Sequence, residues 1–100
     1  MFNIIAESAG TTLSIALEGV LDTQAAPKLE ALINEKIADA TEVKFDFANL
    51  EYLTSAGLRV LLTAQQEMDD KEGIMSLTNV NDEIMEIFDM TGFTDVLTII

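Results

Sequence analysis

Hydrophobic and polar residues alternate along this chain with two periods, that of a strand and that of a helix. In residues 12–18, Leu13, Ile15 and Leu17 fall on one side of an alternating pattern, and polar or small residues fall on the other. Residues 2–8 form a shorter apolar run, and the segment between the two runs is short enough for a hairpin turn. We therefore expect the chain to open with two antiparallel strands.

Helix-like and strand-like segments then follow one another to the end of the chain. Apolar residues at helical spacing predict helices between residues 22 and 41, between 54 and 73, and between 79 and 90. Further strands are predicted at 43–47, 74–80 and 96–100. The candidate helix caps are Asp22 or Thr23, Ser55 or Thr54, and Asn79 or Asn81. The order β-β-α-β-α-β-α-β predicts a single α/β domain over 1–100, with a mixed, largely parallel sheet and helices packed on it.

Size and charge narrow the possible partners. With 100 residues, 49% of them hydrophobic, the chain can bury one core. Its net charge of −13 makes nucleic acid and anionic membrane surfaces unexpected partners, because both are bound by clustered Lys and Arg. No apolar run approaches the length of a membrane span, and no basic segment opens a signal peptide. We expect a cytoplasmic protein without membrane insertion.

The residue types also argue against an enzyme. The chain has no cysteine and no histidine, so thiolate chemistry, Ser-His-Asp systems and imidazole metal sites are excluded. Carboxylates are dense between residues 65 and 95, but their spacing does not fit a calcium loop. This region is expected to be a solvated acidic face, which is compatible with electrostatic steering of a basic partner. We expect no metal site and no cofactor of its own.

Candidate chemistry is concentrated in residues 54–59, at the start of the second predicted helix. A hydroxyl at a helix start is ordinarily a cap that contributes about 1 kcal/mol. The positive end of the helix dipole also favours an anion there, so Ser55 is a candidate for phosphorylation. Arg59 follows one turn later on the same side and could pair with the phosphate. Gly57 leaves the first turn without a side chain, so we expect a partner protein to approach the backbone there.

The same segment resembles a known family. Residues 45–62, FDFANLEYLTSAGLRVLL, are similar to the central signature of STAS domains, and more closely to that of the bacterial anti-sigma factor antagonists. In that signature a strand and a turn lead to Asp-Ser-Ser-Gly-Leu at the start of a helix. Residues 18–22 are similar to the family's Gly-x-Leu-Asp turn, and residues 87–93 to its late helix and glycine turn. The resemblance implies a STAS fold over nearly the whole chain.

The resemblance also implies partner switching. In this family the unphosphorylated antagonist binds an anti-sigma factor that is also a serine kinase, which frees a sigma factor. The kinase, with its own ATP and magnesium, phosphorylates the antagonist and releases it, and a serine phosphatase resets the cycle. By position, Ser55 matches the phosphorylated serine and Gly57 the glycine of the motif. Asp22 matches an aspartate in the turn that lies near the phosphorylation site.

Two positions depart from the family pattern. Thr54 stands where the family has aspartate, which removes a charge beside the acceptor and adds a second hydroxyl. Ala56 stands where the family has a second serine, so Ser55 is the only serine of the loop. Three other functions remain open: a STAS module that is never phosphorylated and docks in an ABC-type transport complex, a sensor of a nucleotide or small anion, and a carboxylate enzyme, for which no motif is present.

Overall fold

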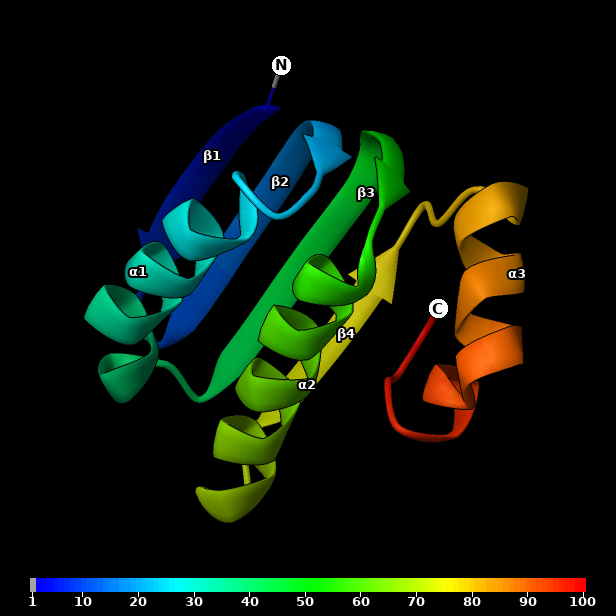
Figure 1. The fold of residues 1–100 in the computed structure, drawn as a ribbon. Helices are drawn as coiled ribbons and strands as arrows, with labels where there is room; N and C mark the ends of the chain where they lie inside the picture. Colours follow the sequence, from blue (N-terminus) through cyan, green and yellow to red (C-terminus); the bar gives the residue numbers. More distant parts are fainter. Residues whose placement is uncertain (1) are drawn as a thin grey trace.

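The computed structural model describes residues 2–100 as one sheet and three helices (Figure 1). The strands are β1 (Phe2–Ala9), β2 (Thr12–Leu21), β3 (Glu42–Leu53) and β4 (Ile74–Thr78), and the helices are α1 (Ala26–Lys36), α2 (Ser55–Asp70) and α3 (Asp82–Thr91). The strand order is β1-β2-β3-β4, with β1 antiparallel to β2 and the other pairs parallel. The predicted fold class, a mixed and largely parallel sheet that opens with a hairpin, is confirmed.

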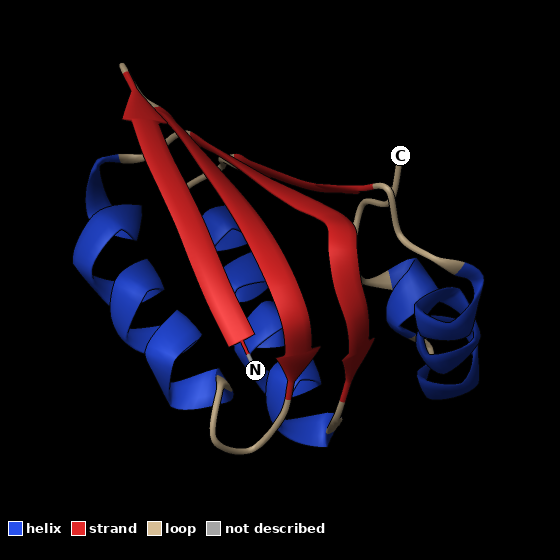
Figure 2. Cartoon of the chain, turned by 90° about the horizontal axis from the view of Figure 1, so that it is seen from above, coloured by secondary structure: helices blue, strands red, loops and turns tan. Residues whose placement is uncertain are grey.

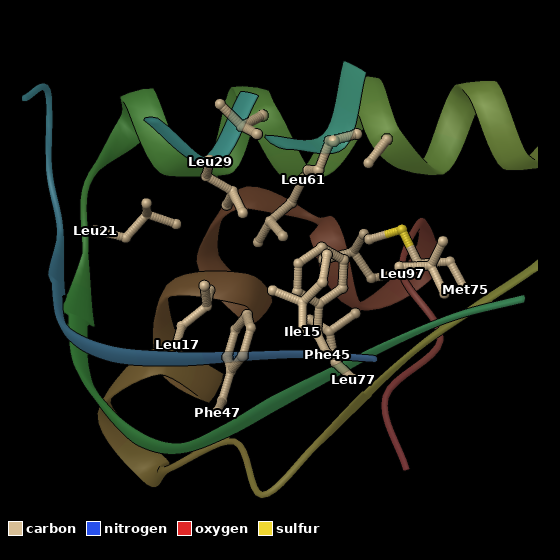
Figure 3. Close-up of a cluster of buried hydrophobic side chains, with 14 of the residues drawn as sticks. Ile15, Leu17, Leu21, Leu29, Phe45, Phe47, Leu61, Met75, Leu77 and Leu97 are labelled. Atoms are coloured by element: carbon tan, nitrogen blue, oxygen red, sulfur yellow. The ribbon is translucent and has the colours of Figure 1, made fainter. Parts of the chain in front are cut away.

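The helices cover one face of the sheet. α1 and α2 lie side by side on that face, and α3 lies beside β3 and β4 (Figures 1 and 2). The covered face of β2 carries Leu13, Ile15 and Leu17, as the alternating pattern predicts. All three belong to one core cluster with Leu29 of α1 and Leu61 of α2. Figure 3 shows Ile15 and Leu17 facing these two helices. Each large apolar side chain that is fully buried contributes about 1.5–3 kcal/mol to stability.

Strands β2 and β3 are longer than the pattern predicts. β2 was expected to turn at Gly19 but continues to Leu21, and β3 was expected at 43–47 but continues to Leu53. Two register shifts interrupt their pairing, and Gly19 adopts a φ of 92°. These bulges break the alternation while turning Leu21 and Leu53 into the core. A strand whose side chains no longer alternate has no strand period to detect, which is why the prediction stopped early.

The predicted last strand at 96–100 is wrong. Residues Phe93–Asp95 form a short 3-10 turn, and Val96 still has helical backbone angles. Extended pairing begins only after Leu97, where Ile99 makes a single parallel bridge to Leu77 of β4. Among the apolar residues of this segment, Leu97 is buried in the core and Ile99 packs partly against it, whereas Val96 and Ile100 are exposed.

Lys71 fixes one end of the α1–α2 pair. Its Nζ donates hydrogen bonds to the carbonyl oxygens of Ile37, Ala38 and Ala40, at 2.6, 3.0 and 3.0 Å. These carbonyls lie where the chain leaves α1, and Lys71 directly follows α2. A cation that satisfies carbonyls at a helix end also opposes the negative end of the helix dipole. The two helices are therefore tied together at the end that lies far from their starts.

Asp46 links β3 to the end of β4. Its Oδ1 accepts a hydrogen bond from the Ala48 backbone N–H at 2.9 Å and another from Asn79 Nδ2 at 3.0 Å. Asn79 has a left-handed φ of 58°, which ends β4 at Thr78, two residues before the predicted end at Val80. The bonds from Asn79 and Ala48 lower the pKa of the Asp46 carboxyl below 3.8.

This lowered pKa predicts an acid-dependent contribution to stability. The contribution is present in full above the pKa of the unfolded chain, about 4, and is lost as pH falls through the lower folded pKa. Asn79→Gly removes the amide donor and keeps the left-handed backbone, so the variant should unfold more easily at pH 6. Its difference from the parent protein should shrink as pH falls below about 4 in urea unfolding. A difference that stays constant over this range would contradict the link.

Candidate functional site

The starts of α1 and α2 lie next to each other because the strands that precede them are parallel. β2 and β3 end at the same edge of the sheet, and each leads into a helix on the same face (Figure 1). The backbone N–H of Thr54 donates to the carbonyl oxygen of Leu21 at 3.0 Å. The predicted site residues Asp22, Thr54, Ser55, Ala56, Gly57 and Arg59 are thereby gathered at one edge. Gly57 is buried, and we call the other five the helix-start surface.

Gly57 is required by packing within the protein. A Cβ added at this position would lie 2.8 Å from both Cγ and Cδ2 of Leu21, and 3.1 Å from its carbonyl oxygen. The Leu21 side chain is completely buried. The expectation that Gly57 leaves room for a partner is therefore wrong, because Leu21 occupies that room and the glycine lets α2 approach β2 closely.

The two hydroxyls at the start of α2 have opposite surroundings. Thr54 is the N-cap residue, but its side chain accepts no hydrogen bond from the helix. Its Oγ1 is buried and has no hydrogen-bond partner. Ser55 is the first residue of α2 and its side chain is exposed. The predicted side-chain cap is thus absent, and of the two hydroxyls only that of Ser55 can be reached by another protein.

The start of α3 has a side-chain cap and acidic residues, both of which the start of α2 lacks. Asn81 caps α3, where its Oδ1 accepts from the backbone N–H of Ile84 at 2.8 Å, which selects Asn81 over Asn79 as the predicted cap. Asp82 and Glu83 place acidic side chains in the first turn of α3. The first turn of α2 contains no acidic residue and receives no side-chain cap. The free N–H groups at the start of α2 remain able to bind an anion.

Asp22 shapes the turn before α1. Its Oδ1 accepts hydrogen bonds from the backbone N–H groups of Gln24 and Ala25, at 3.0 and 2.9 Å. Its carbonyl oxygen accepts from Ala26 at 2.8 Å, and Pro27 lies in the first turn as expected. Asp22 therefore precedes the helix and holds the turn, whereas the formal N-cap is Ala25. The Asp22 side chain is half-buried and lines a hollow together with Gln24 and Lys28.

A shallow groove runs between α1 and α2. Ala26 and Ala56 line it together with Val60, and two opposite charges border it, Glu30 from α1 and Arg59 from α2. Arg59 is exposed. The sequence pattern indicated Arg59 but not Glu30, because the pairing of two helices decides which residue of α1 faces the groove.

Metal-binding and membrane-spanning features are both missing from the described part of the chain, residues 2–100. No group of three or more acidic side chains there converges in a way that could hold a metal ion. None of its helices is long and apolar enough to cross a membrane.

Comparison with known proteins identifies the family. The model of the STAS domain matches residues 3–100. The chain belongs to the STAS domain family. The anti-sigma-B factor antagonist of Listeria monocytogenes is 26% identical to it over 88 residues, which cover 87% of this chain and 77% of the relative. This STAS domain is therefore similar in sequence to a protein named for opposing an anti-sigma factor.

Solved structures of anti-sigma factor antagonists share the fold. The unphosphorylated form of SpoIIAA superposes with a TM-score of 0.79 at 22% identity, covering 100% of this chain and 87% of that one. The phosphorylated form of SpoIIAA from Bacillus superposes with a TM-score of 0.80 at 23% identity, covering 98% and 91%. At these identities the superpositions establish the fold of the STAS domain and leave its site to be argued from its own residues.

The contact between Gly57 and Leu21 predicts a strong penalty for enlarging the glycine. Gly57→Ala should lower the free energy of unfolding by about 1–3 kcal/mol, because the added methyl group overpacks the contact. On helix propensity alone the same change would stabilise the protein by up to about 1 kcal/mol. The penalty should become smaller in a Leu21→Ala background, measured as a double-mutant cycle in urea. Equal penalties in both backgrounds would show that Leu21 is not the obstacle.

Proposed function

We propose that this STAS domain is an anti-sigma factor antagonist that works by partner switching. Its unphosphorylated form binds an anti-sigma factor with serine kinase activity, and phosphorylation of Ser55 ends that binding. The observation that carries the proposal is the exposed Ser55 hydroxyl on the uncapped first turn of α2, beside the buried hydroxyl of Thr54. The likeness to SpoIIAA, described in unphosphorylated and phosphorylated forms, supports it.

The chemistry of the proposed step is divided between two proteins. The partner kinase brings ATP and magnesium, and this chain supplies the acceptor. Ser55 Oγ forms a bond to the γ-phosphorus as the bond between that phosphorus and the leaving oxygen of ADP breaks. The hydroxyl proton passes to a base of the kinase. A serine phosphatase later hydrolyses the phosphoester with water. In this scheme the STAS domain is a binding protein and substrate, not an enzyme.

Charge explains how one modification can end binding. A phosphate adds nearly two negative charges at about pH 7 to a chain whose net charge is already −13. If the helix-start surface contacts the partner, those charges must lose water, and the single positive charge of Arg59 cannot balance nearly two negative ones. An unpaired buried charge costs several kcal/mol, and each step of about 1.4 kcal/mol changes affinity tenfold. Asp22 lies on the same surface and would contribute to docking before phosphorylation.

A docking module that is never phosphorylated, for example in an ABC-type transport complex, is the second candidate. Two residues favour it: Thr54 replaces the aspartate and Ala56 replaces the second serine of the antagonist motif. In that case the same surface would hold its partner constantly, and Ser55 would only begin the helix. The neighbouring genes distinguish these two candidate functions. Genes for a serine kinase and a sigma factor would favour the antagonist, whereas genes for a permease and an ATPase would favour the docking module.

The proposed modification predicts one phosphoryl group on this chain. Intact mass and site mapping on protein purified from growing and stressed native cells should find it on Ser55, with an occupancy that changes with condition. Ser55→Ala should abolish it. Thr54→Val is the matched control, because it removes a hydroxyl that makes no hydrogen bond and should leave the modification in place. Phosphate on Thr54, or none in any condition, would refute the proposed switch.

Partner release predicts an effect of charge at one position. Ser55→Asp should weaken binding to the anti-sigma factor partner at least about tenfold, and Ser55→Ala should bind like the parent protein. Gln66→Asp adds the same charge to another exposed position of α2 and should leave affinity nearly unchanged. Titration calorimetry gives the affinities of the parent protein and the three variants. Equal weakening by Ser55→Asp and Gln66→Asp would attribute the effect to net charge alone.

A further inference from the structure

We propose that Arg59 is a positioning residue that holds the phosphate of phosphorylated Ser55 against the first turn of α2. The inference rests on the phosphorylation of Ser55 proposed above and describes how the phosphorylated state is held. An ordered phosphate would stay on the helix-start surface, over the place where the partner must dock. A phosphate free to rotate into solvent would block that place for only part of the time.

The spacing of the two residues supports this contact. Ser55 is the first residue of α2 and Arg59 lies four residues later, and both side chains are exposed. Residues at this spacing are neighbours on a helix surface, with Cβ atoms about 6 Å apart. Long helical side chains lean toward the helix start, which directs the guanidinium of Arg59 toward the turn that begins at Ser55. Its planar fork can donate two parallel hydrogen bonds to a phosphate.

The electrostatics of the α2 start also favour a bound anion. The first turn has no acidic side chain and no side-chain cap, while Arg59 adds a cation close to the positive end of the helix. A cation at a helix start is unfavourable, and an anion placed between the two positive groups is stabilised by both. The start of α3 differs, because it already has a side-chain cap and two acidic residues in its first turn.

The neighbouring charged groups define the competition for Arg59. Glu30 of α1 borders the same groove as Arg59 and is the carboxylate that competes with the phosphate for it. Lys28 belongs to a different hollow, which it lines together with Asp22 and Gln24. When the phosphate engages Arg59, the groove between α1 and α2 loses its cation and keeps Glu30. Phosphorylation therefore changes the charge of the groove as well as that of the helix start.

The test installs phosphoserine at position 55 of the full chain by codon suppression, so no kinase is required. A titration by phosphorus NMR then gives the second pKa of the phosphate. This pKa should be about half a unit higher in Arg59→Gln than in the otherwise unchanged protein, because the cation that favours the dianion is gone. Lys28→Gln removes the same charge from an exposed position and should raise the pKa by less than half as much.

Equal shifts in the two variants would overturn the proposal, because the phosphate would then sense only net charge. A second measurement is the change in melting temperature on phosphorylation, which should be more favourable in the chain that keeps Arg59 than in the Arg59→Gln variant. The same change in both would also count against the contact. These results do not depend on whether Ser55 is phosphorylated in cells. Absence of phosphate in native cells would remove the proposed function, whereas equal shifts would remove only the role of Arg59.

Discussion

The close contact between the end of β2 and the start of α2 is the constraint on which the rest of the site depends. The Leu21 side chain fills the space where Gly57 has no Cβ, and its carbonyl oxygen accepts the N–H of Thr54. Because Leu21 is completely buried, this contact cannot move without opening the core. It places the turn of Asp22 beside Ser55, while Lys71 ties the same helix pair at its other end. The helix-start surface is thus part of a layer that is held at both ends.

The spacing of apolar residues, together with the turn and cap residues between them, was sufficient to predict most of the fold. The apolar alternation of β2 and the helical spacing in α1 and α2 follow directly from the residues that face one core. The predictions failed where the backbone departs from a regular period. Burial no longer alternates at the bulged ends of β2 and β3, where Leu50 is buried out of phase with Phe45 and Phe47. Leu97 enters the core from the segment after a 3-10 turn. Apolar content indicates burial, but only a regular period indicates the element that provides it.

The candidate site could be located from the sequence but not built from it. The motif around Ser55 and the turn at Asp22 indicated which residues matter, and the parallel strands bring them together. The environment of each group depends on distant partners. The Thr54 hydroxyl is buried and does not cap its helix, although its residue type favours a cap. Whether Gly57 is accessible depends on the Leu21 side chain. Such long-range contacts leave no signature in the local pattern.

The start of α2 departs from local rules that the start of α3 follows. A side-chain cap is worth about 1 kcal/mol, and a buried hydroxyl without a partner costs about 1–3 kcal/mol, yet α2 lacks the first and contains the second at Thr54. α3, in the same domain, has its cap and its acidic first turn. Sequences that otherwise specify a fold consistently tend to violate such rules where function requires it. The proposed switch needs a helix start whose N–H groups and adjacent hydroxyl are free for an incoming phosphate. The absence of a side-chain cap on α2 provides this at a cost in stability.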